Sequence, residues 1–382
     1  MRIMHTSDLH IGKSVHGLSM LEDQKFILEQ MLRMIENEEA DVLVIAGDVY
    51  DRTVPNEGAV SILDDFLTRL HEMGCPAFII PGNHDSATRM SFGSTLLAKQ
   101  GVHIADEFKG GMEKHVLEDA HGTVNLYMVP FFKPSVVRSL NPKAEVNNAD
   151  DAMREVLKAT DINTSERNIL VAHQFVIGRG IELDLGGSEE YKPSVGGVDC
   201  ISYDLFSDFD YVALGHIHRP QKVGRSEIRY CGSPLKYSET EYLDRKGVVI
   251  VDIEEKGTVS TRTVPLVPMR DLRVITGTVE QLKDRSVVES GNPNDYIYVN
   301  LTEDTLDARA KLAEVYPNIM GISVACASGT GKLPEMTIDK IKGLDPSELF
   351  RDFYKEMNGE EISEEQERIF STALERARRD LL

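Results

Sequence analysis

The chain has 382 residues, of which 41% are hydrophobic and 27% are charged. These values are ordinary for a globular protein and exclude a disordered or fibrous one, while the length favours two or more folding units. The formal net charge of -21 gives a surface that repels phosphate polyanions at long range. No apolar run approaches the roughly 18 residues that span a bilayer. The four cysteines include no C-x-x-C pair, so we expect a cytoplasmic chain with reduced thiols and no membrane segment.

Apolar runs alternate with amphipathic stretches through the first half of the chain, which is typical of an α/β architecture. Helices are predicted over residues 22–38 and 57–73, where apolar side chains recur at i, i+3 and i+4. On the first helix this spacing places Phe26, Gln30 and Met34 on the buried face, beside Ile27, Met31 and Ile35. Residues 178–198, rich in glycine and acid, predict a long functional loop. Strands are predicted at residues 2–6, 41–46, 76–80, 125–130, 168–172, 211–214 and 246–251.

The second half of the chain predicts two further units. Paired prolines at residues 265–268 indicate a boundary, so the first domain is expected to span residues 1–265. Beyond it, a small α+β domain over residues 270–340 is expected, with strands at 272–278, 296–301 and 321–327 and a helix at 306–315. A helical segment over residues 344–382 carries two amphipathic helices, which begin at Asp345 and Ser363. Their apolar stripes are expected to dock on a partner protein or to pack back on the small domain.

Five of the apolar runs end directly in residue types that bind metals. In an open α/β sheet the carboxyl ends of the strands converge, so these side chains are expected to meet in one place. Seven ligands are too many for one ion, but they suit two ions about 3.5 to 4 Å apart that share a carboxylate, activate water and clamp a phosphoryl group. One such strand end alone is more often a turn or a surface residue, so only their coincidence indicates a site. The seven residues are Asp8, His10, Asp48, Asn83, His173, His216 and His218.

The same residues carry a family resemblance. Asp8-x-His10, Gly47-Asp48-x-x-Asp51, Gly82-Asn83-His84-Asp85, His173 and Gly215-His216-x-His218 together resemble the signature of calcineurin-like metallophosphoesterases. More narrowly, residues 196–199, 210–221 and 230–238 resemble the SbcD-type nuclease subunits. The resemblance implies a metallophosphoesterase β-sandwich flanked by helices, followed by a small α+β capping domain and C-terminal helices.

The resemblance also assigns ligands. It implies that Asp48 bridges two divalent ions, with Mn²⁺ as the expected metal. The ligand types alone leave Zn²⁺ and Fe²⁺ open. It gives one ion to Asp8, His10 and His218, and the other to Asn83, His173 and His216.

Two further residues are candidates for catalysis. His84 follows a ligand, and its ring is expected to face the substrate and to protonate the leaving 3′ oxygen. The Asp51 carboxylate is expected to orient His84, since a nearby carboxylate keeps the proton on an imidazole. The alternative for Asp51 is a turn-stabilising role, and Asp85 is a further candidate for either role.

The resemblance implies a Mn²⁺-dependent DNA nuclease, acting as a 3′–5′ double-strand exonuclease and a single-strand or hairpin endonuclease in DNA repair, recombination and replication. It implies homodimers and docking of the terminal helices on an SbcC-type SMC-like ATPase. Because of the acidic charge, DNA has to be attracted locally, and the basic candidates are Lys133, Arg138, Arg219, Lys222 and Lys236.

Two competing functions remain open. A phosphomonoesterase is one, because residues 47–52 resemble a Ser/Thr phosphatase block in which Arg52 would grip phosphate. A non-catalytic scaffold that retains the metal pocket is the other. Residues 325–333 look like a P-loop but lack its first glycine and its hydroxyl, so no nucleotide hydrolysis is expected.

Overall fold

The structure is a computed structural model that describes residues 1–178, 183–184, 199–324, 350–351, 354–355, 362–363 and 366–370. Most of the predicted loop at 178–198, the P-loop-like residues 325–333 and most of both terminal helices therefore lie outside the described residues. Within the described part of the chain, no helix is long and apolar enough to cross a membrane.

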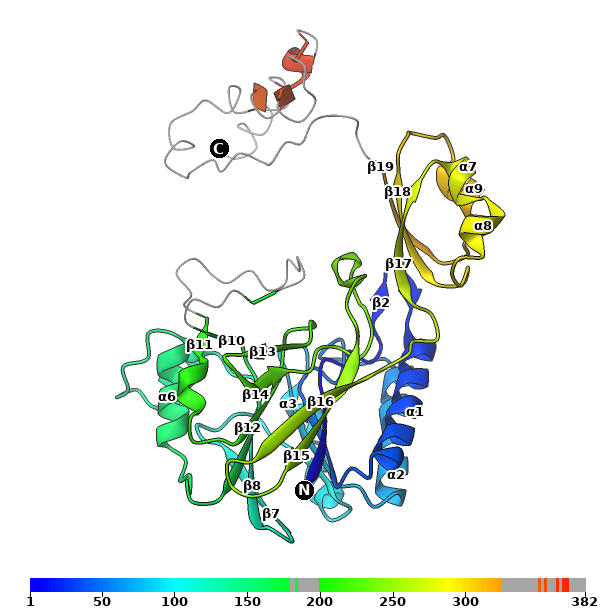
Figure 1. The fold of residues 1–382 in the computed structure, drawn as a ribbon. Helices are drawn as coiled ribbons and strands as arrows, with labels where there is room; N and C mark the ends of the chain where they lie inside the picture. Colours follow the sequence, from blue (N-terminus) through cyan, green and yellow to red (C-terminus); the bar gives the residue numbers. More distant parts are fainter. Residues whose placement is uncertain are drawn as a thin grey trace.

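The first sheet has the strand order β16-β15-β1-β4-β5-β6. Strands β1, β4, β5 and the edge strand β6 run parallel, and β15 and β16 are added antiparallel on the other side of β1. Helices α1 (Leu21–Asn37) and α2 (Glu57–Glu72) cover its outer face (Figure 1). The strands are β1 (Arg2–Thr6), β4 (Val42–Ala46), β5 (Ala77–Ile80), β6 (Val102–Ile104), β15 (Gly247–Ile253) and β16 (Val259–Pro265).

The second sheet has the strand order β13-β14-β12-β9-β8-β7. Its four central strands run parallel, and the edge strands β7 and β13 are antiparallel. Side chains of α6 (Ala149–Lys158) and α5 (Pro134–Leu140) form an apolar core with its outer face. The strands are β7 (Glu113–Asp119), β8 (Gly122–Val129), β9 (Arg167–His173), β12 (Tyr211–Gly215), β13 (Gln221–Val223) and β14 (Arg225–Tyr230).

The two sheets pack face to face. Apolar side chains from both inner faces, such as Val44, Phe78, Val171 and Tyr211, form one buried core between them. Strands buried on both faces read as continuous apolar runs, which is why these segments were recognisable in the sequence. The expected sandwich flanked by helices is confirmed. The ligand-bearing strand ends, however, come from two facing sheets and not from one open sheet.

A smaller parallel sheet follows the sandwich (Figure 1). It consists of β17 (Leu272–Gly277), β18 (Tyr296–Leu301) and β19 (Ile319–Val324), with β18 in the centre. Helices α7 (Val279–Leu282), α8 (Arg285–Val288) and α9 (Ala308–Ala313) pack on this sheet. Of the paired prolines, Pro265 is the last residue of β16 and Pro268 lies between β16 and β17.

Ionic contacts fix the small domain to the sandwich. Arg270 Nη2 lies 2.5 Å from Asp23 Oδ2 on α1, and the Tyr296 hydroxyl donates to the same oxygen at 2.7 Å. Lys236 Nζ lies 2.8 Å from Asp271 Oδ1. The remaining short elements are β2 (Ser14–Val15), β3 (Leu18–Ser19), α3 (Ala87–Met90), α4 (Ser94–Ala98), β10 (Val176–Ile177), β11 (Ile201–Ser202), η2 (Tyr203–Phe206) and η3 (Glu239–Glu241).

Candidate metal centre

The loops that follow five parallel strands meet between the sheets. β1, β4 and β5 deliver Asp8, His10, Asp48 and Asn83, while β9 ends in His173 and β12 is followed by His216 and His218. Several of these residues have a left-handed backbone, with φ of 52° at Asp8, 45° at His10, 50° at Asp48 and 100° at His216. Such conformations are uncommon outside glycine and cluster at functional sites.

Glycines around the centre allow the close approach of its backbone segments. A Cβ on Gly47 would lie 2.2 Å from His173 Nδ1, and one on Gly215 would lie 1.9 Å from the carbonyl oxygen of Ala46. A Cβ on Gly82 would lie 2.1 Å from Asp48 Oδ1. Each of these glycines directly precedes a residue of the centre. Because the added Cβ would clash with His173 or Asp48, a side chain at any of these positions would displace a candidate ligand.

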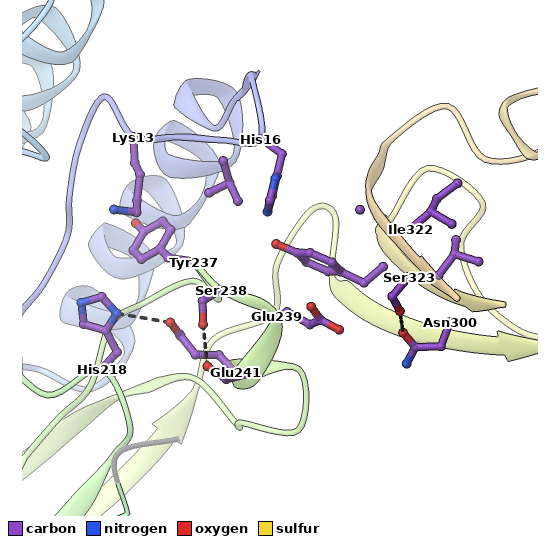
Figure 2. Close-up of a pocket in the computed structure, with 15 residues that line it drawn as sticks. Lys13, His16, His218, Tyr237, Ser238, Glu239, Glu241, Asn300, Ile322 and Ser323 are labelled. Atoms are coloured by element: carbon purple, nitrogen blue, oxygen red, sulfur yellow. Dashed lines mark hydrogen bonds and ion pairs between the residues drawn. The ribbon is translucent and has the colours of Figure 1, made fainter. Parts of the chain in front are cut away.

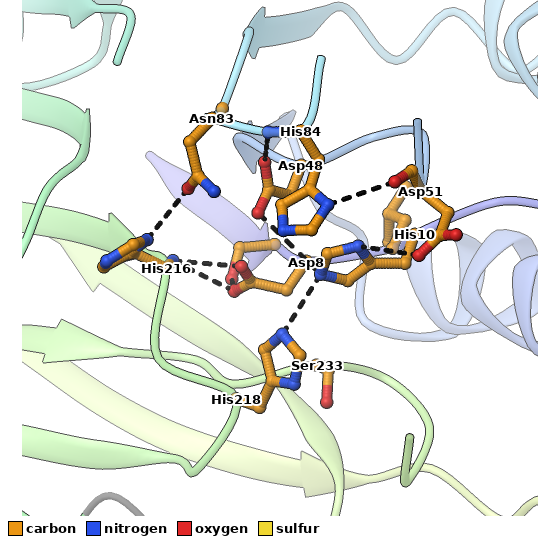
Figure 3. A network of polar contacts seen from close by, with 12 residues as sticks. Asp8, His10, Asp48, Asp51, Asn83, His84, His216, His218 and Ser233 are labelled. Atoms are coloured by element: carbon orange, nitrogen blue, oxygen red, sulfur yellow. Dashed lines mark hydrogen bonds and ion pairs between the residues drawn. The ribbon is translucent and has the colours of Figure 1, made fainter. Parts of the chain in front are cut away.

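The first group of ligand atoms comes from Asp8, His10 and His218, which lie within 4.8 Å of one another (Figure 3). The two Nε2 atoms of His10 and His218 are 3.0 Å apart. All three side chains are buried. The backbone N–H of His216 donates to Asp8 Oδ1 at 3.0 Å, which holds the carboxylate in place.

The second group comes from Asn83, His173 and His216. Asn83 Oδ1 lies 3.1 Å from His173 Nε2 and 3.0 Å from His216 Nδ1. His173 Nδ1 lies 2.7 Å from the carbonyl oxygen of Ala46. Because a carbonyl only accepts, Nδ1 carries the proton, and Nε2 of a neutral His173 is available as a ligand.

Asp48 lies between the two groups. Its Oδ2 is 3.2 Å from His173 Nε2 and 3.8 Å from His10 Nε2. This oxygen is buried without a hydrogen-bond partner among the described residues, which is costly unless a cation is bound there. The donor set of carboxylates, imidazoles and one amide also suits a divalent transition metal. The residues present therefore fit a pair of cations with Asp48 between them.

The charges within the centre are strongly coupled. Burial alone would raise the pKa of Asp48, but the His173 and His10 imidazoles hold it well below its usual value. Burial dominates at Asp8 and raises its pKa. For His173, burial is outweighed by Asp48 and Asp8, which raise its pKa to about 9. Burial lowers the pKa of His216 to about 3.

His84 lies beside Asp48. Its backbone N–H donates to Asp48 Oδ1 at 2.9 Å, and its Nδ1 lies 3.0 Å from the carbonyl oxygen of Asp51. The expected contact of the Asp51 carboxylate with His84 therefore differs from the arrangement found, in which the Asp51 backbone holds the ring. The carboxylate instead lies 2.8 Å from Lys13 Nζ and 3.7 Å from His10 Nδ1.

Asp85 connects the two loops that carry Asp48 and Asn83. Its carboxylate accepts hydrogen bonds from the backbone N–H groups of Val49 at 3.0 Å, Tyr50 at 2.8 Å and Gly82 at 2.9 Å. Burial raises its pKa to about 6. The sequence offered Asp85 as a further candidate for either role weighed for Asp51, and the structure gives it a supporting place beneath the two loops.

Gln24 supports the loop of His10 in the same way. Its Nε2 donates to the carbonyl oxygen of His10 at 2.7 Å, and its Oε1 accepts from Gly12 N at 2.9 Å. Sequence reasoning missed this residue. The available signal was a polar residue close to the apolar stripe of α1.

The basic candidates for DNA contact differ in their surroundings. Arg219 Nη2 lies 2.7 Å from Asp244 Oδ1, and Lys236 pairs with Asp271, so both are engaged in ion pairs. Lys133, Arg138 and Lys222 are exposed. A cavity of about 460 Å³ separates His218 from the small domain and is lined by Tyr237 and Tyr298 (Figure 2).

Comparison with known proteins gives consistent matches. Residues 1–220 match the family model described as calcineurin-like phosphoesterase, and residues 268–358 match the one described as type 5 capsule protein repressor C-terminal domain. A Staphylococcus epidermidis protein, named as the D component of the nuclease SbcCD, is 32% identical over 373 residues, 96% of each chain. Its namesake from Staphylococcus saprophyticus is 32% identical over 385 residues, 98% of this chain and 99% of the relative. A solved dimetal phosphatase from Danio rerio covers 70% of this chain and 99% of its own, with 12% identity and a TM-score of 0.39.

Proposed function

Because this chain belongs to the SbcD family of nuclease subunits, within the calcineurin-like phosphoesterases, we propose that it hydrolyses DNA phosphodiester bonds with two bound metal ions. The observation that carries the proposal is the position of Asp48. Its Oδ2 is buried and makes no hydrogen bond to any described residue, and it lies 3.8 Å from His10 Nε2 of the first ligand group and 3.2 Å from His173 Nε2 of the second. Two cations held close together by a shared carboxylate can stabilise both the attacking and the leaving oxygen of an in-line displacement at phosphorus.

Each residue of the centre has a defined task in this reaction. Asp8, His10 and His218 would hold one ion, Asn83, His173 and His216 the other, and Asp48 would bridge. When bound, the ions supply an activated water and neutralise the charge that builds on the phosphoryl oxygens. We propose Mn²⁺ as the metal because the family resemblance implies it, and the mixed set of carboxylate, imidazole and amide ligands is compatible with it, as it is with Zn²⁺ and Fe²⁺.

His84 is the proposed general acid. Its Nδ1 lies 3.0 Å from the carbonyl oxygen of Asp51 and therefore carries a proton there, which fixes the orientation of the ring. When the imidazole is doubly protonated, Nε2 can donate its proton to the 3′ oxygen that leaves phosphorus. In this proposal Asp51 orients His84 through its backbone.

The wider function follows the relatives' names. Those proteins are named as one component of a nuclease called SbcCD, so we propose that this chain assembles with an SbcC-type SMC-like ATPase and forms homodimers. We propose cleavage of double-strand ends with 3′–5′ polarity and of single strands and hairpins, in the cytoplasm and in service of DNA repair, recombination and replication. The described cysteines are buried and free, which agrees with a reducing compartment.

The experiment that tests this proposal compares two substrates. The purified chain, with and without the SMC-like ATPase and ATP, is incubated with Mn²⁺ and either end-labelled hairpin DNA or a phosphomonoester. We expect cleavage of DNA, little turnover of the monoester, and loss of both activities in Asp48→Asn. Preferred turnover of the monoester would instead support the phosphatase, in which the exposed Arg52 would grip phosphate. No Mn²⁺-dependent turnover under any condition would support the scaffold.

A further inference from the structure

A buried carboxylate that the proposed reaction does not use lies behind His218. Glu241 is only 5% exposed and ends the short helix η3. Its Oε1 lies 3.2 Å from His218 Nδ1, on the side of the ring that faces away from His10 (Figures 2 and 3). A buried carboxylate is costly unless it is paired, so its place against a candidate ligand calls for a reason.

Lys246 holds this carboxylate and the ligand at once. Its buried Nζ lies 2.5 Å from Glu241 Oε2, 2.8 Å from the carbonyl oxygen of His218 and 3.0 Å from Ser233 Oγ. The backbone N–H of Ser233 donates to the same His218 carbonyl at 3.1 Å. The ammonium group therefore compensates the charge of Glu241 and fixes the backbone of His218.

His173 is oriented in a similar way, but by a different hydrogen-bond acceptor. Its Nδ1 donates to the backbone carbonyl of Ala46, which leaves Nε2 for the metal. At His218 the acceptor that faces Nδ1 is a side-chain carboxylate. A neutral imidazole carries one N–H, so an acceptor at Nδ1 keeps the proton off Nε2.

We infer that Glu241 is a positioning residue for His218, held in place by Lys246. Its carboxylate accepts a hydrogen bond from the Nδ1 N–H of His218, fixes the orientation of the ring and leaves Nε2 free to bind a metal ion. This inference rests on the proposed function only in taking His218 as a ligand. The competing explanation is that Glu241 and Lys246 form an ion pair that stabilises the fold alone.

The test uses Glu241→Gln in the full chain, with Asp210→Asn as the matched control. Asp210 is a buried carboxylate that also binds a lysine, with Lys256 Nζ at 2.9 Å, but it precedes β12 whereas His218 follows that strand. Mn²⁺ affinity is measured by the EPR signal of the free ion. We expect Glu241→Gln to bind Mn²⁺ about 10 to 100-fold more weakly, with DNA cleavage recovered by excess Mn²⁺, and Asp210→Asn to keep wild-type affinity.

Unchanged Mn²⁺ affinity in a Glu241→Gln variant with a lowered melting temperature would overturn the inference. If that variant fails to fold, the inference is tested instead on the metal-free wild type, in which ¹⁵N-detected NMR determines which imidazole nitrogen of His218 carries the proton. The spectrum is recorded at a pH where the ring carries a single proton: a proton on Nδ1 supports the inference, and a proton on Nε2 overturns it. A wild type that binds Mn²⁺ but cleaves no DNA would overturn the proposed function only.

Discussion

Gly82 lies directly against Asp48, so that a Cβ on Gly82 would lie 2.1 Å from Asp48 Oδ1 and 2.4 Å from its backbone nitrogen. Both atoms belong to the residue proposed to bridge the ions, and a backbone nitrogen has little freedom to move. We therefore expect Gly82→Ala to lose bound metal and to cut DNA about 100-fold more slowly. Metal content by mass spectrometry and the cleavage rate check this.

Gly111→Ala is the control for that variant, because a Cβ there meets only Thr160 Oγ1 at 3.9 Å. This variant should keep the metal content and the DNA cleavage rate of the wild type. Full metal content and full activity in Gly82→Ala would show that the Asp48 loop can shift without consequence.

His84→Ala tests whether His84 acts on the substrate or on the metal. A ring nitrogen of His84 lies within 4.8 Å of ligand atoms of His10 and Asp48, so geometry alone permits both roles. As a general acid, its removal should slow cleavage by about 100 to 10,000-fold while metal binding is retained. His121→Ala, an exposed histidine in the β7–β8 turn, should change neither quantity. Loss of metal from His84→Ala would make His84 a ligand.

Asp119 and Arg167 predict a pH-dependent contribution to stability. The buried guanidinium lies 2.5 and 3.0 Å from the two Asp119 oxygens and also donates to the carbonyl oxygens of Gly122 and Glu254. These bonds join the two sheets at the end of β9 opposite to His173. Asp119→Asn should lower the free energy of unfolding at pH 7 by about 3 kcal/mol, since a buried cation loses its charged partner.

The sign of the pH effect follows from the pKa. The Arg167 hydrogen bonds hold the pKa of Asp119 well below its usual value, so its contribution is complete at neutral pH and is lost as the pH falls through the folded-state pKa. Urea unfolding should show a constant difference between wild type and Asp119→Asn above about pH 5, which shrinks below about pH 4. Asp106→Asn, which breaks an exposed pair with Lys109, should have little effect at any pH. An equal difference at pH 3 and pH 7 would contradict the prediction.

Charge reversal of Lys133 and Arg138 tests the local attraction of DNA to an acidic chain. Both residues are exposed at α5, and Arg138 donates to the carbonyl oxygen of Val146. The double variant to Glu should bind DNA more weakly and with a shallower salt dependence, by about 0.9 in the log-log slope for each phosphate that is no longer neutralised. The same reversal at exposed Lys25 and Arg33 on α1 is the control. An unchanged slope would place the DNA contact on the partner.

Most inner strands and the long helices were predictable because burial dictates their composition, but the inner strand β14 (Arg225–Tyr230), which is mostly polar, was not predicted. The predicted strand at 2–6 coincides with β1, and the predicted helix at 57–73 matches α2 within one residue. The strands β7 and β16 were not predicted. Both lie at sheet edges, and their side chains are exposed or half-buried. They are held by backbone hydrogen bonds to β8 and β15, which leave no apolar pattern in the sequence.

The buried face of α1 was predicted only in part. Ile27, Met31 and Ile35 are buried as expected, but Leu28 and Leu32 complete the face in place of Phe26, Gln30 and Met34. The helix is turned toward Gln24 and Asp23, which bind the His10 loop and Arg270. Those contacts join segments far apart in the sequence, so periodicity alone could not locate the centre of the stripe.

The residues of the candidate site also fall into a predictable and an unpredictable group. The structure brings together all seven predicted ligand residues, because each follows a recognisable strand whose direction fixes where it ends. The residues that support them were not predictable. Asp85, Gln24 and Glu241 act through backbone groups or rings of distant segments, and only the assembled fold shows which carboxylate or amide faces which loop.

The division of the ligands between two facing sheets has a consequence for assembly. Asp8 and Asp48 belong to one sheet and His173 and His218 to the other, so neither sheet alone possesses a complete binding site. Metal ions bound there would link the two sheets, because each ion would have ligands from both. Removal of the ions by a chelator should therefore weaken the contact between the sheets before it unfolds either sheet. Metal binding would then report that folding is complete, because only a chain in which the two sheets have already packed together can hold the ions.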